Sequence, residues 1–395
     1  MKLTEIIQTK YSKVLSDLCH KSKNLYNEAN WYIRQDYFKL ENFLSYYDLD
    51  LILKSKESYR NLPSQTSQQI LKVLSRSWKS FFKTNKDYLS NPKKYKKRPK
   101  LPHYKKKDGE FMLIFTNQQC KIKDGFLYFP KRVKFRPIKT RIVEKLKEVR
   151  IVPLGPKYKV EIVYEKEEQD LKLNKDNVLA IDLGLNNLIT AVNNIGLKPI
   201  IVKGGVLKSI NQYYNKQLAL YKSIAKKVNG VEETKRIRRL YLTKNNKMID
   251  KFHKISKKII EFCVDNNIGT MVIGYNKGWK HNINIGKKNN QFFVQIPFSR
   301  LIKQLEYKST MVGIQVILVN ESYTSKCSFL DNEPIEKRVH NKGKRISRGL
   351  FRSSNGTIIN ADVNAGYNIM KKALPNAISA DGIEDVGFHP CFISI

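Results

Sequence analysis

Residues 177–184 read NVLAIDLG, an apolar run that ends in Asp182 and is followed at once by Leu183 and Gly184. Such a run predicts a buried β-strand, and a glycine directly after it allows the chain to turn sharply. Two more short apolar runs follow, LITAVNN at 188–194 and KPIIVKG at 198–204. Together they predict three consecutive strands, of which 177–184 is the first.

The segments that follow alternate between helical and strand patterns. Apolar residues recur at helical spacing at 248, 252, 255, 259 and 262, and a further helix is predicted over 298–311. Strands are predicted at TMVIG, 270–274, and IQVILVN, 314–320, and a last helix over 362–373. Three strands followed by two strand–helix units is the element order of an RNase H-like α/β domain, with an expected strand order of 3-2-1-4-5.

Three acids occupy the ends of these elements. Asp182 ends the first strand, Asp362 begins the last helix, and Glu321 follows the fifth strand. The fourth strand ends at Gly274 with no acid, so Glu321 is expected to reach across one strand spacing of about 4.8 Å and act as the second ligand. Two divalent cations held by hard oxygen ligands need such a cluster. The simpler reading makes Asp182 a turn residue, Glu321 an exposed loop residue and Asp362 a helix cap, which Asn360 also offers.

The charge of the chain points to a polyanionic partner. Lys and Arg total 74 against 35 Asp and Glu, a net charge of +39 over 395 residues, which favours nucleic-acid binding over a Lys-rich surface of no function. No apolar run of about 18 residues and no signal peptide is found. We therefore expect no membrane partner, no small-molecule substrate and a cytoplasmic, nucleoid-associated prokaryotic protein. The five scattered cysteines fit reduced thiols.

The N-terminal half changes pattern twice. Residues 12–85 show helical spacing, and 111–164 show short alternating runs that predict a small β-barrel. Between them, PKKYKKRPKLPHYKKK at 92–107 reads as an extended basic loop, because three prolines exclude a regular helix. Its cations and rings suit a nucleic-acid backbone, although a solvated linker has a similar composition. The charged segment 165–176 is the best candidate for a domain boundary.

Four segments resemble the RuvC motifs of the TnpB family, the insertion-sequence nucleases ancestral to type V CRISPR effectors. They begin at Asp182 (DLGLNNL), Gly274 (GYNKGWK), Glu321 (ESYTSKCS) and Asn360 (NADVNAGYNI). The resemblance covers essentially the whole chain and implies a multidomain, bilobed α+β protein. It implies five parts: 1–11, the first part of a wedge barrel; 12–90, a helical recognition domain; 91–175, the wedge β-barrel with its basic loop; 176–395, a RuvC-like nuclease domain; and, within it, 323–360, a degenerate zinc-ribbon-like insertion that binds target nucleic acid.

The resemblance also implies an activity. Such proteins bind a guide RNA from the transposon end, recognise a short motif beside a double-stranded target and cut the DNA at one RuvC site. Asp182 and Asp362 correspond to the first and third catalytic acids, with Glu321 in a shifted second position, and the site would hold two Mg²⁺ ions, or Mn²⁺. Base pairing would select the sequence while the protein grips backbones through charge.

The chain departs from the family in its cysteines. Zinc ribbons bind tetrahedral Zn²⁺ through four Cys or His ligands. Here the interval 328–361 has no cysteine, and only Cys327 and His340 remain as candidates. We therefore expect no structural zinc.

Three other functions stay open. The empty fourth-strand position suits a nuclease-deficient RNA-guided repressor. A DNA transposase also uses an RNase H-like acid triad, and a structured RNA-binding protein with a relic nuclease fold is the minimal alternative.

Candidate nucleic-acid contacts come from three basic segments. Tyr323 is expected to pack in the core or on a strand, and Trp279, flanked by Lys277 and Lys280, remains undecided between packing and stacking. The candidate cations are Lys93, Lys94, Lys96, Lys97, Arg98, Lys105 and Lys106 in the basic loop, Arg236, Arg238 and Arg239 before the long helix, and Lys344, Arg345, Arg348 and Arg352 in the insertion.

Overall fold

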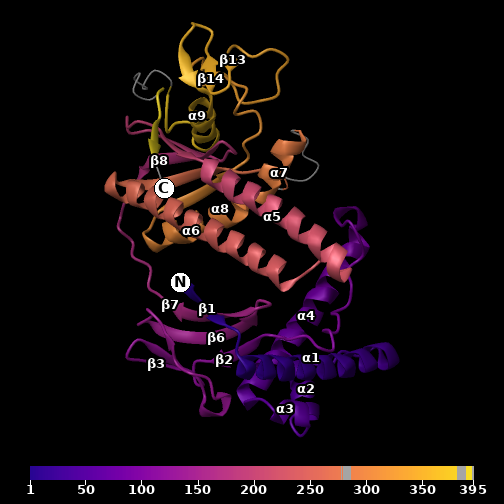
Figure 1. The fold of residues 1–395 in the computed structure, drawn as a ribbon. Coiled ribbons are helices and arrows are strands. Elements are labelled where there is room, and N and C mark those ends of the chain that lie inside the picture. The colour runs from indigo at the N-terminus through magenta and orange to yellow at the C-terminus, as the bar shows by residue number, and fades with distance from the viewer. Residues whose placement is uncertain (277, 279–285, 380–387, 394–395) are drawn as a thin grey trace. The chain divides into compact units, whose positions relative to one another are not determined.

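The computed structural model describes residues 1–276, 278, 286–379 and 388–393. The chain forms two compact units, Met1–Lys166 and Glu167–Ile395. Their division falls within the charged segment 165–176. Figure 1 labels the helices and strands of each unit.

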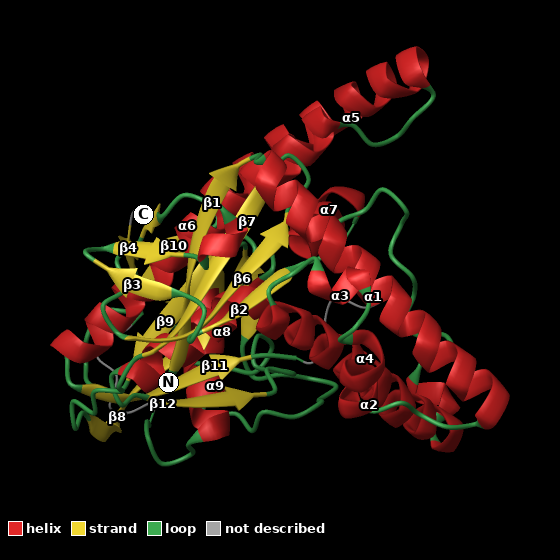
Figure 2. Ribbon diagram, turned by 90° about the horizontal axis from the view of Figure 1, so that it is seen from below, coloured by secondary structure: helices red, strands yellow, loops and turns green. Residues whose placement is uncertain are grey.

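The first unit, all of which is described, combines long helices with antiparallel strands (Figures 1 and 2). Its helices are α1 (Lys13–Leu40), α2 (Tyr46–Leu53), α3 (Glu57–Arg60) and α4 (Ser64–Ser90). Its strands are β1 (Lys2–Lys10), β2 (Leu113–Thr116), β3 (Lys121–Lys123), β4 (Phe126–Tyr128), β5 (Ile138–Lys139), β6 (Lys145–Pro153) and β7 (Lys157–Glu165). Two single 3₁₀ turns complete it, at Pro92–Lys94 and Lys131–Val133.

The predicted β-barrel takes the form of two antiparallel sheets rather than one closed sheet. Their strand orders are β1-β7-β6-β2 and β3-β4-β5. The first strand of the chain therefore pairs with β7, from Lys2 opposite Glu165 to Lys10 opposite Lys157. This pairing brings residues 1–10 back to the β-rich part of the unit.

The helices of the first unit pack around Trp78, which is fully buried on α4. Its Nε1 donates a hydrogen bond of 2.9 Å to Asn30 Oδ1 on α1, so the one polar atom of the indole is satisfied. The rings of Tyr37, Phe43 and Phe82 surround it. Large aromatic side chains of this kind contribute most of the buried area in a small core.

The second unit contains a six-stranded mixed sheet in the order β12-β11-β8-β9-β10-β16. The strands are β8 (Asn174–Asp182), β9 (Asn187–Asn193), β10 (Ile200–Lys203), β11 (Ile268–Gly274), β12 (Gln315–Val319) and β16 (Cys391–Ile393). The first five follow the predicted 3-2-1-4-5 order, which is confirmed. The sixth was not predicted: β16 pairs in parallel with β10 at the edge.

Helices cover both faces of this sheet. They are α5 (Gly205–Asn229), α6 (Lys235–Asp265), α7 (Lys287–Gln295), α8 (Phe298–Met311) and α9 (Ala361–Ala373). On β8, Leu179 and Ile181 pack in one cluster with α6 and α8, while Val178 and Ala180 belong to the cluster around α9. A strand buried on both faces needs an unbroken apolar run, as the sequence has. In the described ranges, no helix is long and apolar enough to cross a membrane.

The segment between β12 and α9 folds over a small antiparallel sheet of β13 (Lys344–Ser347), β14 (Leu350–Arg352) and β15 (Ile358–Asn360). Two asparagines one turn apart on α9 bind the start of this segment through hydrogen bonds. Asn364 donates to Cys327 O (2.9 Å) and accepts from Phe329 N (2.9 Å), and Asn368 donates to the carbonyls of Thr324 and Cys327 (2.9 and 2.8 Å).

A buried carboxylate closes the same segment. Glu333 is fully buried, and its two oxygens accept hydrogen bonds from Ser328 N (2.7 Å) and Lys342 N (3.1 Å). These bonds join residues 14 positions apart. Glu333 thus ties the two ends of the loop together with hydrogen bonds.

We expect Glu333→Ala to loosen residues 328–342. Each buried group left without its partner costs about 1–3 kcal/mol, so amide hydrogen exchange at Ser328 and Lys342 should rise at least tenfold. Glu336→Ala is the matched control, because Glu336 is exposed and its carboxylate pairs with Arg338 on the surface. Equal exchange in both variants would contradict a clamp at Glu333.

Candidate active site

Asp182 is the last residue of β8 and lies at the carboxyl end of the sheet. The chain turns immediately after it, and a Cβ on Gly184 would lie 2.5 Å from Asn187 O. Real Cβ contacts are never so short, so the turn requires glycine there, as the sequence predicts. The next strand begins at Asn187, whose side chain also enters the site.

The empty position on the fourth strand is filled in space by Glu321. Gly274 ends β11 opposite Val319 of β12. The residue before it, Ile273, lies opposite Ile181, which directly precedes Asp182 on β8. A Cβ placed on Gly274 would lie 3.0 Å from Glu321 Oε2. The carboxylate therefore occupies the space in which a side chain from the fourth strand would begin.

Asn276 holds Glu321 in this position through two reciprocal contacts. Its Nδ2 donates to Glu321 Oε1 (3.3 Å), and its Oδ1 accepts from the Glu321 backbone N–H (3.1 Å). Glu321 Oε2 is buried and makes no hydrogen bond in the described part of the chain. One carboxylate oxygen is thus fixed, and the other is available to a ligand.

Asp362 lies in the first turn of α9. The side chain of Asn360 caps that helix by accepting from the backbone N–H groups of Asp362 and Val363, so the Asp362 carboxylate is not used as the cap. It accepts a hydrogen bond from Asn187 Nδ2 (2.7 Å), and Arg345 of β13 lies 3.8 Å from its other oxygen.

Burial and neighbouring charge change the pKa of two of these carboxylates. Burial, then the negative charges of Glu321 and Asp362, raise the pKa of Asp182 to about 8, against the opposing effects of the Leu183 N–H and Arg345. Burial raises the pKa of Glu321 to about 7. The Asp182 residue as a whole is partly exposed, but its carboxylate is enclosed by protein atoms. An added cation relieves this concentration of negative charge.

Within the described residues, no three His, Cys, Asp or Glu side chains already stand at metal-binding spacing. The residues nonetheless fit a divalent metal, because they offer oxygen donors, one of them a buried oxygen without a partner.

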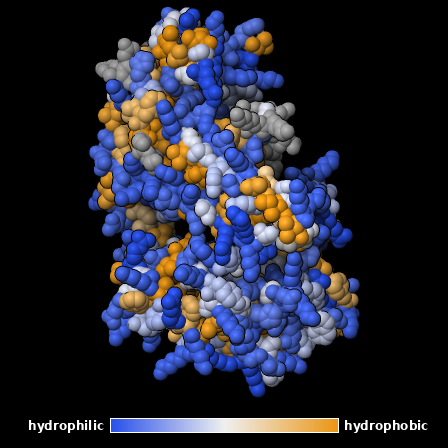
Figure 3. Space-filling view, in the orientation of Figure 1, coloured by the Kyte–Doolittle hydropathy of each residue, from blue (hydrophilic) through white to orange (hydrophobic). Residues whose placement is uncertain are grey.

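The candidate cations of the basic loop differ in their surroundings. Lys94 pairs with Asp87 (2.6 Å), and Lys105 Nζ lies over the rings of Tyr26 and Phe111, so these two are engaged within the protein. The remaining side chains project into solvent: Lys93, Lys96, Lys97, Arg98 and Lys106. Figure 3 shows a face of the molecule that is largely hydrophilic.

The other candidate cations lie in the second unit. Arg236 stacks on Tyr221 (4.1 Å to the ring centroid), Arg238 pairs with Glu233 (3.2 Å), and Arg239 is exposed. In the insertion, Lys344 is paired in register with Arg352, and Arg348 lies in the turn that joins their strands. Arg345 on that hairpin is the cation that reaches an acid of the site.

The prediction that Tyr323 packs in the core or on a strand is wrong. Its side chain is 40% exposed, and its φ is +71° in the turn after Glu321. A left-handed residue that begins a turn cannot continue a strand. Lys277, Trp279 and Lys280 lie outside the described residues.

The candidate zinc ligands have different environments. Cys327 is fully buried, with its Sγ 3.9 Å from the carbonyl oxygen of Glu336, whereas His340 is exposed. Sequence reasoning missed the asparagines that organise the site and the insertion, at 187, 276, 364 and 368. A repeat was visible for two of them, because Asn360, Asn364 and Asn368 recur every four residues on one helical face.

The sheet order, with acids at its carboxyl edge and on the last helix, is the arrangement that the sequence predicts for an RNase H-like α/β domain. Comparisons with known proteins narrow this class. Residues 161–280 match the family OrfB_IS605, described as a probable transposase, and residues 298–369 match the Cas12f1-like TNB domain. Over these ranges the chain is similar to OrfB_IS605 proteins and to the Cas12f1-like TNB domain.

Two relatives and one solved structure extend the comparison. The CRISPR-associated endodeoxyribonuclease Cas12f2 of a Micrarchaeota archaeon is 30% identical over 55% of this chain, a match that spans only 41% of that relative. The TnpB-like protein ORF457 of Acidianus two-tailed virus is 25% identical over 91% of this chain and 83% of its own length. The fold resembles that of Cas12f1 in a complex with sgRNA and target DNA, with a TM-score of 0.55 and 13% identity over 91% of this chain and 83% of that one.

Proposed function

We propose that the chain is an RNA-guided DNA endonuclease with a single Mg²⁺-dependent site formed by Asp182, Glu321 and Asp362. The observation that carries this proposal is the place of the Glu321 carboxylate, which lies over Gly274 beside Asp182. A shifted acid with a dedicated partner in Asn276 is the arrangement expected of a retained ligand. An exposed loop glutamate would need no such support.

Each residue has a role that its contacts suggest. Asp182, Glu321 and Asp362 would hold two Mg²⁺ ions, or Mn²⁺, which supply an activated water and stabilise the leaving oxygen of a phosphodiester. Asn276 orients Glu321, the second acid, and Asn187 orients Asp362, the third, each through a hydrogen bond. Arg345 lies close enough to the site to meet a phosphate there.

The partners follow from charge and from the relatives. A net charge of +39 suits a guide RNA together with a double-stranded DNA target. The similar structure is a complex with sgRNA and target DNA, and one relative is named an endodeoxyribonuclease. We assign guide and target binding to residues 1–175 and to the insertion 323–360, and cleavage to 176–395.

The test is to purify the chain with the RNA of its own locus, sequence that RNA, and offer a matched target beside a randomised flank with Mg²⁺. We expect cleavage of targets with one short flanking motif, and no cleavage in EDTA. Guided binding without cleavage would instead support a repressor, the alternative that the absence of an acid at Gly274 favours. Joining of transposon ends without RNA would support a transposase.

Asn276→Ala should weaken metal binding and slow cleavage by about tenfold or more, because partners that orient metal ligands typically contribute about 10–100-fold. Titration with Mn²⁺, followed by its electron paramagnetic resonance signal, measures the binding separately from cleavage. Asn266→Ala is the control, since Asn266 lies at the end of α6 and its side chain donates to Phe262 O of the same helix. Unchanged Mn²⁺ affinity in Asn276→Ala would contradict the positioning role.

A further inference from the structure

A groove of about 740 Å³ runs through the first unit between α4 and residues 99–105 of the basic loop. On α4 it is bordered by residues at helical spacing, among them Arg76, Ser77, Ser80 and Phe81. On the loop side it is bordered by Lys100 and His103, among others. Cations border both walls, and no acid belongs to the lining.

The loop wall is held in place by one face of α1. Lys23, Asn27, Asn30 and Arg34 recur about once per turn, and each donates to a main-chain carbonyl of the loop: Lys107 (2.6 Å), Lys105 (2.9 Å) and, for the last two, Pro102 (3.1 and 2.8 Å). Asn27 also accepts from Lys105 N. The backbone of the loop is thus satisfied by the protein, while Lys100 and His103 stay exposed.

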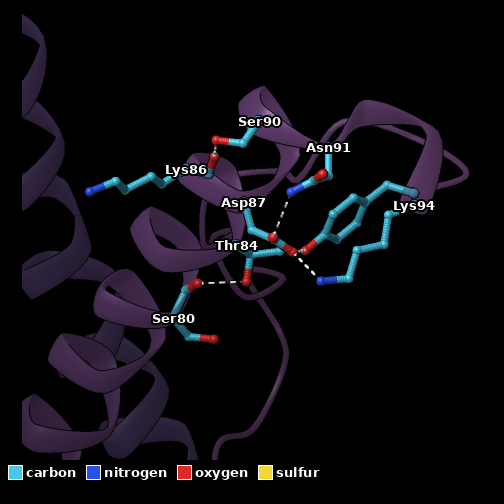
Figure 4. Close-up of polar contacts among 8 residues, drawn as sticks. Ser80, Thr84, Lys86, Asp87, Ser90, Asn91 and Lys94 are labelled. Atoms are coloured by element: carbon cyan, nitrogen blue, oxygen red, sulfur yellow. Dashed lines mark hydrogen bonds and ion pairs between the residues drawn. The ribbon is translucent and has the colours of Figure 1, made fainter.

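The start of the loop is fastened to the end of α4. Figure 4 shows Asp87 accepting hydrogen bonds from Lys94 and Asn91, and Tyr95 donates to the same carboxylate. Both ends of the loop are therefore anchored, one to α4 and the other to α1. The groove exists before any ligand arrives, which lowers the entropic cost of binding.

Two hydroxyl groups on the α4 wall are engaged within the helix itself. Ser77 and Thr84 turn their hydroxyls back to their own helix, bonding Val73 O (2.9 Å) and Ser80 O (2.7 Å), the second of which is drawn in Figure 4. Ser80 is exposed, and Phe81 beside it is half-buried. The α4 wall therefore offers the apolar ring of Phe81, the hydroxyl of Ser80 and the guanidinium of Arg76.

We propose that this groove holds one or two nucleotides of a single nucleic-acid strand, with phosphates against Arg76 and Lys100 and a base over Phe81. Cations without acids select a polyanion, and a partly exposed ring suits an unpaired base. A volume of about 740 Å³ lies in the range of small-molecule clefts, which is room for one or two nucleotides. The inference rests on one part of the proposed function, namely that the chain binds nucleic acid.

The test measures binding of the full chain to labelled single-stranded RNA, single-stranded DNA and duplex DNA over a range of salt concentrations. Arg76→Glu with Lys100→Glu reverses the charge inside the groove. Lys79→Glu with Lys83→Glu makes the same change on exposed residues of α4 outside the groove. Ser80→Trp fills the groove without changing charge, and Ser80→Ala leaves it open.

We expect the groove pair to weaken single-strand binding at least tenfold more than the control pair, and to lower the slope of log affinity against log salt by roughly 1–2. Ser80→Trp should weaken binding at least fivefold and Ser80→Ala less than twofold. A larger loss with RNA or with DNA identifies the strand. Equal losses in the two charge pairs, unchanged binding by Ser80→Trp, or full competition by duplex DNA would each overturn the proposal. A Glu321 variant that loses cleavage but keeps single-strand binding would support the groove proposal independently of the nuclease site.

Discussion

Replacing Glu321 with glutamine is expected to slow target cleavage about 1,000-fold or more while guided DNA binding is retained. Glutamine has the size of glutamate but no negative charge, so it cannot replace a carboxylate ligand of Mg²⁺. Loss of groups that only orient a ligand already costs about 10–100-fold, and loss of the ligand itself should cost more. Single-turnover cleavage of a matched target, beside a gel-shift assay of the same complex, measures both quantities.

The stability of this variant provides its control. The pKa of Glu321 is about 7 in the folded chain, above its ordinary value of 4.5, so the folded state retains the proton over that window and ionisation at higher pH costs stability. Glutamine removes this cost. In EDTA at pH 8 we therefore expect the variant to melt no lower than the parent. Glu336 is an exposed acid 15 residues further along the chain. As a control, the Glu336→Gln variant should cleave like the parent. Cleavage by Glu321→Gln within tenfold of the parent would assign the second ligand elsewhere.

The sheet could be predicted because the apolar pattern of each main strand is visible in its own short sequence. The run at 178–181 is apolar without interruption, and in the structure its residues alternate between two buried clusters. The turn after Asp182 was predictable for a similar reason, since only glycine fits at 184. Strand order then followed from the element order, three strands and then two strand–helix units, which is that of an RNase H-like domain.

The parts that escaped prediction depend on pairings between distant residues. Strand β16 has three residues and is defined only by its partner β10, and the two sheets of the first unit differ from a barrel only in how their edges meet. Asn276 was visible as a residue of the fourth-strand motif, but its function appears only once Glu321 is beside it. The contact of Arg345 with Asp362 requires the hairpin of the insertion to reach the site. No local pattern contains such information.

Gly274 explains why the shifted acid and the missing acid belong together. A residue larger than glycine at this position would enter the space of the Glu321 carboxylate and of Ile369. The chain therefore has room for a carboxylate from the fourth strand or for one from beyond the fifth, but not for both. The absence of an acid at 274 is, on this view, a condition for Glu321 to act.

Gly274→Ala is accordingly expected to slow cleavage about 10-fold to 100-fold, since displacing a catalytic group by about 1 Å costs up to about 100-fold. The added methyl would stand 3.0 Å from Glu321 Oε2 and 2.6 Å from Ile369 Cδ1. These two contacts are separable. Ile369→Val removes the Cδ1 atom, at a stability cost of about 1 kcal/mol, and leaves the acids in place.

The double variant Gly274→Ala with Ile369→Val decides the cause. If displacement of Glu321 slows the reaction, the double variant should cleave as slowly as Gly274→Ala, and both should bind Mn²⁺ more weakly than Ile369→Val alone. If crowding against α9 were responsible, Ile369→Val would restore the rate. Gly269→Ala completes the comparison at the other end of β11, where a Cβ would meet the backbone of Asn174 at 2.6 Å. It should lower the melting temperature, and any remaining folded protein should bind Mn²⁺ normally, because the strain lies far from the carboxyl edge at which the three acids meet.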